Sequence, residues 1–188
     1  MKIEVDEQYC PNLYVFQTLY NKKYISFGNM EWIVLAREGD KALLLSKDCI
    51  EERAFHEELK PVTWEACSLR SYLNGQWYDE TFTEVEKAKI LTTNVNHSDG
   101  ICGASGGNDT EDKAFLLSID EAERYFSTDH ERITYLDGEA KWWWLRSPGG
   151  LNICAADVYD DGRVSAYGRR VSSDSVGVRP AIWIKLES

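Results

Sequence analysis

Cysteines and histidines are the side chains of this chain that could carry covalent or metal chemistry. The cysteines are odd in number and widely spaced, and no CxxC pair occurs, so neither a disulfide framework nor a zinc site is indicated. We expect buried thiols in a reducing compartment. The cysteines are Cys10, Cys49, Cys67, Cys102 and Cys154.

The histidines are far apart in the sequence, and each has polar neighbours, so we expect His56, His97 and His130 to lie on the surface. No Ser-His-Asp order, HExxH motif or glycine-rich phosphate loop is present. Residues 108–112 place oxygen ligands at the close spacing that calcium needs, but turn capping explains the same residues and is favoured. The sequence therefore predicts no catalytic residue, no metal site and no cofactor.

The C-terminal segment 145–182 has a restricted composition that stands out from the rest of the chain. It contains no Glu, Lys, Gln, Met or Trp, although these five types make up 41 of the 188 residues. Turn-rich β segments are poor in several of these types, which accounts for part of the gap. Asn, Asp, Tyr, Ser and Arg lie between regularly placed Gly, Ala and Val, without a hydrophobic period of their own.

Length and charge limit the classes of function. A chain of 188 residues is expected to form a single domain, and its net charge of −11, without a basic stripe, argues against nucleic-acid binding. The first 20 residues contain early acidic residues and no continuous apolar run, so neither a signal peptide nor a membrane span is expected. We expect a cytoplasmic protein by default, which a dedicated route or a phage particle could carry to a surface.

Strand signals occur at both ends of the chain. After an irregular segment 1–21, residues Tyr24–Phe27, 31–37 and Lys41–Ser46 favour strands, and a short turn joins the last two. Residues 114–117 and 142–145 form short apolar segments, which favour strands. Segments 156–158 and 163–165 flank Asp160-Asp161-Gly162, a strong hairpin signal. Residues 177–185 form an alternating strand with Val178, Pro180, Ile182 and Ile184 on one side.

Three short helices are predicted between these strands. The first begins after Thr63, passes through Leu69 and ends near residues 74–75. Capping boxes at residues 83–86 and 118–121 begin the second, which continues to Ile90, and the third, which passes through Phe126. A glycine-rich loop spans residues 94–110. Strands at both ends with helices between them predict an α+β fold whose termini meet in one sheet.

Six phrases of the sequence carry a resemblance to a known family. In order along the chain, they are FGNMEWIVL, ALLLSKD, VTWEACSLRSYLNGQWYDETFTEVEKAKI, DKAFLLSIDEAERYF, WWLRSPG and GVRPAIWI. Over about residues 22–186 the chain resembles a bacterial family labelled as a domain of unknown function, itself similar to the C-type lectin fold in the branch of formylglycine-generating enzymes. The resemblance implies one C-type-lectin-like domain over residues 1–188, with short helices around a small, mainly antiparallel sheet and the termini close together. Gly177-Val178-Arg179 would close the domain.

Within this group the segment 142–184 most resembles the variable proteins of diversity-generating retroelements. There a reverse transcriptase substitutes any base at template adenines, and Asn codons altered in this way cannot encode Glu, Lys, Gln, Met or Trp. The resemblance implies a ligand-binding display protein whose diversified side chains share one exposed surface. These residues are Leu151, Asn152, Ile153, Cys154, Asp157, Tyr159, Asp160, Arg163, Ser165, Ala166, Tyr167, Arg169, Arg170, Ser172, Ser173, Asp174 and Ser175. They are called the tail surface below.

The remaining tail residues would be scaffold on this interpretation. Arg146 and Arg179 would pair with buried carbonyls or carboxylates. Within the tail surface, two tyrosines and three arginines have the chemistry of binding anchors, namely Tyr159, Tyr167, Arg163, Arg169 and Arg170. The side chains expected to be buried are Trp143, Val158, Val164, Val178 and Ile182.

Two other interpretations stay open. A fixed, non-catalytic family member could act as a scaffold or interaction domain of a bacterial or phage assembly. An enzyme of the formylglycine-generating type would use a cysteine pair near the C-terminus, whereas this tail contains Cys154 alone. The Glu-Pro-Asn and Trp-Asn-Asp motifs of calcium-dependent sugar-binding lectins are absent. We expect no enzymatic activity, and a partner that is a protein or a cell-surface ligand.

Overall fold

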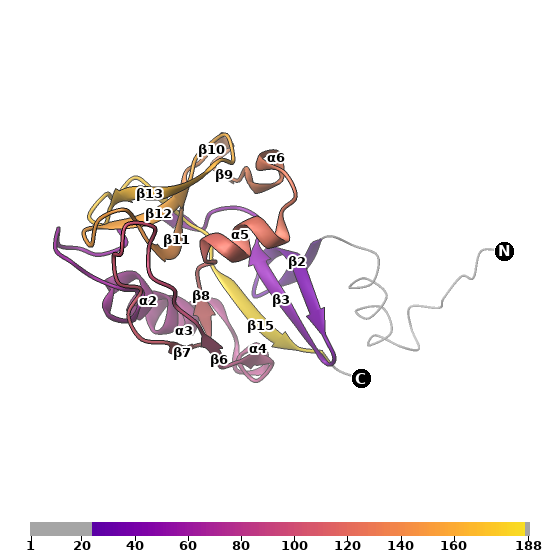
Figure 1. Ribbon diagram of the computed structural model, residues 1–188. Coiled ribbons are helices and arrows are strands. Elements are labelled where there is room, and N and C mark those ends of the chain that lie inside the picture. The colour runs from indigo at the N-terminus through magenta and orange to yellow at the C-terminus, as the bar shows by residue number, and fades with distance from the viewer. Residues whose placement is uncertain (1–23, 187–188) are drawn as a thin grey trace, which may run out of the picture.

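The computed structural model describes residues 24–186, and the C-terminal strand lies within the larger of its two main sheets (Figure 1). The strands of this sheet are β1 (Tyr24–Phe27), β2 (Met30–Glu38), β3 (Lys41–Ser46), β5 (Ile90–Leu91), β8 (Ala114–Phe115) and β15 (Ala181–Lys185). Their order is β1-β2-β3-β15-β5, with β8 also paired to β15, and every pairing is antiparallel.

The second main sheet carries most of the tail. Its strands are β4 (Glu51–Glu52), β11 (Trp143–Pro148), β12 (Cys154–Val158), β13 (Val164–Arg170) and β14 (Gly177–Val178). Their order is β13-β12-β11-β14-β4, so β13 is an edge strand, and only the β11–β14 pair is parallel. Two short ladders complete the strands: β6 (Thr93–Val95) with β7 (Thr110–Asp112), and β9 (Tyr135–Leu136) with β10 (Glu139–Ala140).

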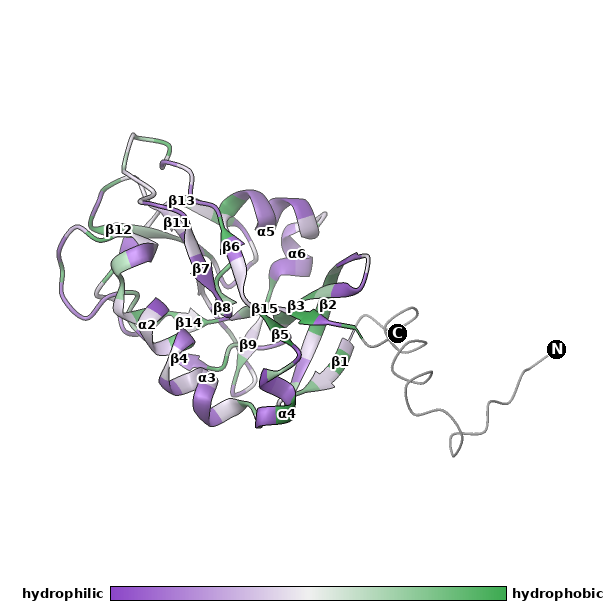
Figure 2. Cartoon of the chain, turned by 90° about the horizontal axis from the view of Figure 1, so that it is seen from below, coloured by the Kyte–Doolittle hydropathy of each residue, from purple (hydrophilic) through white to green (hydrophobic). Residues whose placement is uncertain are grey.

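Strands from both ends of the described chain meet in one sheet, which confirms the predicted α+β class. Ala181 of β15 lies opposite Leu45 of β3. The buried side chains of both sheets and of the helices belong to one hydrophobic cluster. Figure 2 shows apolar residues along β3 and mostly polar residues on the outer helices. The segment 1–21, predicted to be irregular, lies outside the described residues.

The structure has more helical segments than the three that the sequence predicts. They are a 3-10 turn, η1 (Trp64–Ala66), and the helices α2 (Ser68–Asn74), α3 (Gln76–Thr81), α4 (Glu84–Lys87), α5 (Ile119–Tyr125) and α6 (Asp129–Arg132). Both predicted capping boxes, Thr83 with Glu86 and Ser118 with Glu121, are present. The expectation that α4 continues to Ile90 is wrong, because Ile90 joins β5 and pairs with β15.

The prediction of one helix beginning at Thr63 is also wrong. The Thr63 side chain makes no capping bond, and Cys67 is extended with ψ 151°, which separates η1 from α2. The Cys67 sulfur caps α2 by accepting a hydrogen bond from the Arg70 N–H at 3.3 Å. In one continuous helix Trp64 and Leu69 would point about 140° apart, given about 100° per residue. The break lets both side chains be buried in the core.

The expected strand 177–185 is divided between the two sheets. Gly177 and Val178 form β14, whereas residues from Ala181 onward form β15, with Arg179 and Pro180 between them. Residues 176–184 are all buried, so the predicted separation into one buried and one open side does not hold. The segment is covered on both sides because it passes from one sheet to the other through the shared core.

Candidate functional site

The tail surface is built on the β12–β13 hairpin, at the end of the domain opposite the β2–β3 hairpin (Figure 1). Its turn forms at the predicted position, where the Tyr159 N–H donates to the Arg163 carbonyl at 2.9 Å. Gly168 has a φ of +67°, and a side chain there would overlap the Ala155 carbonyl oxygen. The ladder shifts register next to this glycine, and the Tyr167 side chain is 70% exposed.

Main-chain hydrogen bonds hold the loop that precedes β12. The Val62 N–H donates to the Asn152 carbonyl at 3.1 Å, and the Gly150 N–H donates to the Tyr167 carbonyl at 2.9 Å. The same kind of bond links Cys154 to Leu151 and Val171 to Ile153. Because these bonds use backbone atoms, they do not depend on which side chains occupy the loop. The Leu151 side chain is 63% exposed.

Every side chain of the tail surface except that of Asp157 is exposed or half-buried. Among the residues expected in the core, Trp143, Val158, Val178 and Ile182 are fully buried. Val164 was also expected to be buried, but it is only half-buried, because it lies on the edge strand β13.

Asp157 contradicts the expectation of exposure, since only 1% of it is accessible. It lies opposite Ser165 of β13, and the Nε of Arg169 is 3.5 Å from its Oδ2. The Arg169 guanidinium carbon lies 3.6 Å from the centroid of the Trp142 ring. Burial raises the pKa of Asp157 to about 6, and the positive charge of Arg169 acts in the opposite direction. Asp157 is thus a buried charge within an otherwise open surface.

Two loops outside the tail, residues 53–63 and the glycine-rich loop 94–110, border the tail surface. The sequence singled out the glycine-rich loop as functional or pinned by other elements, but it did not place either loop beside the tail. Gly100 in the glycine-rich loop runs so close to the Gly149 carbonyl that a Cβ atom would come within 2.8 Å of it. A narrow crevice is lined by parts of three segments, including Val62, Ser105 and Cys154. These loops carry the exposed side chains Leu59 and Ile101, at 48% and 59%. The available signal was an isolated large apolar residue in a polar loop.

Arg146 and Arg179 have structural roles, as predicted. Arg146 pairs with Glu121 and donates to the Leu116 carbonyl at 2.8 Å. Arg179, 1% exposed, donates to the carbonyls of Ser46 and Lys47 at 2.9 and 3.0 Å. Burial lowers the pKa of Arg179 to about 10. Arg179 thus satisfies backbone acceptors where the chain passes from β14 to β15, and Arg146 links β11 to Leu116 and Glu121.

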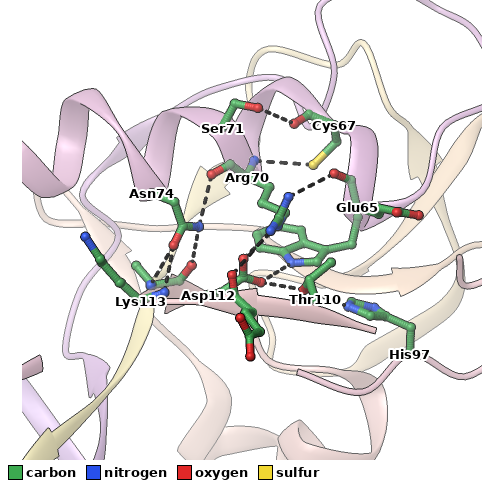
Figure 3. A network of polar contacts seen from close by, with 12 residues as sticks. Glu65, Cys67, Arg70, Ser71, Asn74, His97, Thr110, Asp112 and Lys113 are labelled. Carbon is green, nitrogen blue, oxygen red and sulfur yellow. Dashed lines mark hydrogen bonds and ion pairs between the residues drawn. The ribbon is translucent and has the colours of Figure 1, made fainter. Parts of the chain in front are cut away.

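A buried polar network lies on the inner side of the glycine-rich loop. Figure 3 shows Arg70 and Thr110 converging on Asp112, whose carboxylate also accepts a hydrogen bond from the Trp64 indole. His97 contacts the Thr110 hydroxyl at 3.3 Å. The carboxylate oxygens of Asp112, considered above as calcium ligands, are thus engaged by protein donors. Within residues 24–186, no group of three or more Asp, Glu, His and Cys side chains is arranged to hold a metal ion.

A family model described as a domain of unknown function (DUF6273) matches residues 39–186. The chain belongs to the DUF6273 family. No curated protein and no solved structure matched the chain.

The cysteines of this DUF6273 domain differ in accessibility. Burial raises the pKa of the Cys49 thiol to about 11 and that of the Cys67 thiol to about 12. Cys102 is exposed and Cys154 is half-buried. All four are free, and Cys10 lies outside the described residues. The expectation of buried thiols therefore holds for Cys49 and Cys67, whereas Cys102 lies in the exposed glycine-rich loop.

The histidines of the DUF6273 domain are less exposed than expected. His130 lies on the surface, but His56 and His97 are half-buried. The His56 Nδ1 accepts a hydrogen bond from the Ser68 N–H at 3.2 Å, and burial lowers the pKa of His97. The His56 ring contacts the start of α2 and the His97 ring contacts the start of β7, roles that their polar sequence neighbours did not reveal. In the described part of the chain, no helix is both long and apolar enough to cross a membrane.

Proposed function

We propose that this DUF6273 domain is a ligand-binding display protein whose tail surface is diversified by retroelement mutagenesis. The observation that carries the proposal is that residues 149–175 separate into open positions held by the backbone and buried positions that pack in the core. The loop positions expected to vary are held by main-chain hydrogen bonds, whereas interleaved small residues such as Ala155, Ala156 and Val158 fill the core. Such a backbone can accept many side chains at the open positions without losing its shape.

A C-type-lectin-like scaffold is part of the proposal. Strands from both ends of the described chain lie side by side as β3 and β15. The tryptophan-rich strand β11 lies next to β14, and the Gly177 N–H donates to the Trp142 carbonyl at 2.7 Å. The glycine-rich loop runs close to the second sheet at Gly149. These features support a scaffold that places loops around the β12–β13 hairpin.

The DNA beside the gene tests the diversification. We expect a near-copy of the tail coding sequence and a reverse transcriptase gene, with mismatches between the two copies confined to template adenines. If no template copy is present, the domain is a fixed interaction module and the diversification part of the proposal is wrong.

A display experiment tests the binding function separately. A library would randomise every tail-surface position except Asp157 and be selected for binding to hen-egg lysozyme as a model target. A matched library would randomise the buried residues Ala155, Ala156, Val158 and Val171. We expect most members of the first library to fold and to yield binders, and most of the second to unfold, because the second creates cavities or overpacks the core. Equal folding failure in both libraries would contradict the proposal.

The proposal also makes the domain non-catalytic. The half-buried Cys154 is the single cysteine of residues 142–184, so the tail offers no cysteine pair. An assay for conversion of a substrate cysteine to formylglycine, with copper present, should show no turnover. Any turnover that is lost in Cys154→Ser would overturn this part of the proposal.

A further inference from the structure

Asp157 is a buried carboxylate, with 1% of the residue accessible, and it faces the side chains of Ser165 and Arg169. Among the described residues, neither of its oxygens has a hydrogen-bond partner at good geometry. The Arg169 Nε, at 3.5 Å from Oδ2, makes an ion contact that is too long for a good hydrogen bond. An ionised carboxylate has about four acceptor sites, so Asp157 retains most of its capacity to bind a cation.

Two aromatic rings, those of Trp142 and Tyr159, lie beside the Arg169 guanidinium that contacts this carboxylate. The Trp142 ring and the Tyr159 ring lie with their centroids 4.4 Å apart. The guanidinium of Arg169 lies over the Trp142 face, at 3.6 Å from the centroid. A cation can be bound by an aromatic face and a carboxylate that contact it together. Both interactions are stronger when water is excluded.

The guanidinium of Arg169, which contacts both Asp157 and Trp142, is held differently from the guanidinium groups of Arg146 and Arg179. Arg146 and Arg179 donate several hydrogen bonds to backbone carbonyls. The polar contact of the Arg169 side chain is its ion pair with Asp157, and 32% of this side chain is exposed. The contacts with Asp157 and Trp142 therefore hold the guanidinium in place.

We propose that Trp142 and Asp157 form a cation subsite within the tail surface, which the Arg169 side chain occupies in this chain and which accepts a guanidinium group of a protein ligand when residue 169 is small. The inference rests on the proposed function, because it takes position 169 to vary among versions of the domain. In versions with a small residue 169, an arginine of the ligand takes the place of Arg169. In this chain, the internal arginine closes the subsite.

Chemical complementation tests the subsite without knowledge of the natural ligand. Full-length Arg169→Ala is titrated with methylguanidinium chloride, and the indole N–H resonance of Trp142 is followed by NMR. We expect saturable binding in the millimolar range that is at least about tenfold tighter than in the wild-type protein, where Arg169 competes for the same place. The melting temperature of Arg169→Ala should rise toward that of the wild type as methylguanidinium is added.

Two controls define the result. Sodium chloride at equal ionic strength should not reproduce the effect, and the double variant Arg169→Ala/Asp157→Asn should lose saturable binding. A folded Arg169→Ala protein that responds equally to both salts would overturn the subsite. If Arg169→Ala does not fold, Arg169→Ser is tested in the same way. Failure of both to fold, even with methylguanidinium present, would make Arg169 a structural residue and also overturn the proposal.

These outcomes concern the subsite alone. The template copy in the neighbouring DNA and the lysozyme-binding library test the proposed function without using position 157, so either proposal can fail while the other stands.

Discussion

The indole N–H of Trp64 donates a hydrogen bond to the Asp112 carboxylate at 2.8 Å, and this bond ties η1 to β7. The same carboxylate accepts hydrogen bonds from Arg70 and Thr110, both at 2.7 Å. The network thereby fixes the base of the glycine-rich loop, whose outer part borders the tail surface. The shape of that border depends on a carboxylate that is buried among protein donors.

Replacement of Asp112 by Asn should destabilise the domain strongly. An amide cannot accept from all of the donors that now share the carboxylate, and Arg70 loses its ion pair. We expect the free energy of unfolding, measured by urea titration, to fall by about 3 kcal/mol. The matched control is Glu111→Gln at the exposed neighbouring position, which should change it by less than about 0.5 kcal/mol. Similar losses in both variants would show that the network is not the cause.

Asp157 should give the stability a characteristic pH dependence. Its pKa is about 6 in the folded protein against 3.8 ordinarily, so the folded state binds this proton more tightly than the unfolded chain does. The resulting stabilisation is complete below about pH 4 and is lost as the pH rises through 6, a difference of at most about 3 kcal/mol. Asp157→Asn should therefore gain stability relative to the wild type between pH 4 and pH 8, as measured by urea titration at each pH.

Asp161 serves as the control, because its contribution to stability should change with pH in the opposite direction. Hydrogen bonds from the Arg163 backbone and side chain lower the pKa of Asp161. Its stabilisation is present above the ordinary pKa and is lost as the pH falls. Asp161→Asn should therefore lose stability relative to the wild type as the pH rises from acid to neutral. A flat difference curve for Asp157→Asn would show that its carboxylate is not perturbed by burial.

Gly168→Ala should disrupt the tail hairpin. The φ of +67° disfavours any L side chain, and the added methyl group would also meet the Ala155 carbonyl. Gly39 has a similar φ of +61° with open space around it, so Gly39→Ala carries the conformational cost alone. By thermal unfolding we expect a loss of about 1 kcal/mol for Gly39→Ala and more than about 3 kcal/mol for Gly168→Ala. Equal losses would mean that the carbonyl contact is relieved at little cost.

Thiol reactivity should follow burial. In the native protein Cys102 should react first with iodoacetamide, followed by Cys154, whereas Cys49 and Cys67 should react only on unfolding. Peptide mass spectrometry at intervals after mixing gives the order, and the same experiment in 6 M guanidinium (about the usual denaturing concentration) provides the unfolded reference. Early labelling of Cys67 would contradict its position in the core.

The features that could be predicted from the sequence are those fixed by local chemistry. The capping boxes at Thr83 and Ser118 and the hairpin at Asp160-Asp161-Gly162 depend on residues within a few positions of each other, and all three form. Val158 is buried as expected, although β12 does not alternate, because its neighbour Asp157 is buried as well. These patterns were sufficient for the α+β class, whereas the tail surface was expected from the family resemblance alone.

The features that were missed depend on contacts between distant segments. Cys67 ends one helical turn and begins another because Trp64 must reach Asp112, 48 residues away. Asp157 is covered because Arg169 lies over it from the neighbouring strand. The separation of β14 from β15 follows from the buried Arg179, which bonds to carbonyls more than 130 residues earlier. None of these contacts can be predicted from a local sequence pattern.

The position of β15 has a consequence for synthesis of the protein. This strand lies between β3 and β5 in the large sheet, yet it is made after every residue of the tail surface. A chain that stops anywhere within residues 149–175 lacks the strand that joins the two halves of that sheet, and its apolar partners remain open to water. Truncated products should therefore fail to fold and be degraded. Folding of the domain thus requires translation to continue past the tail surface and through β15.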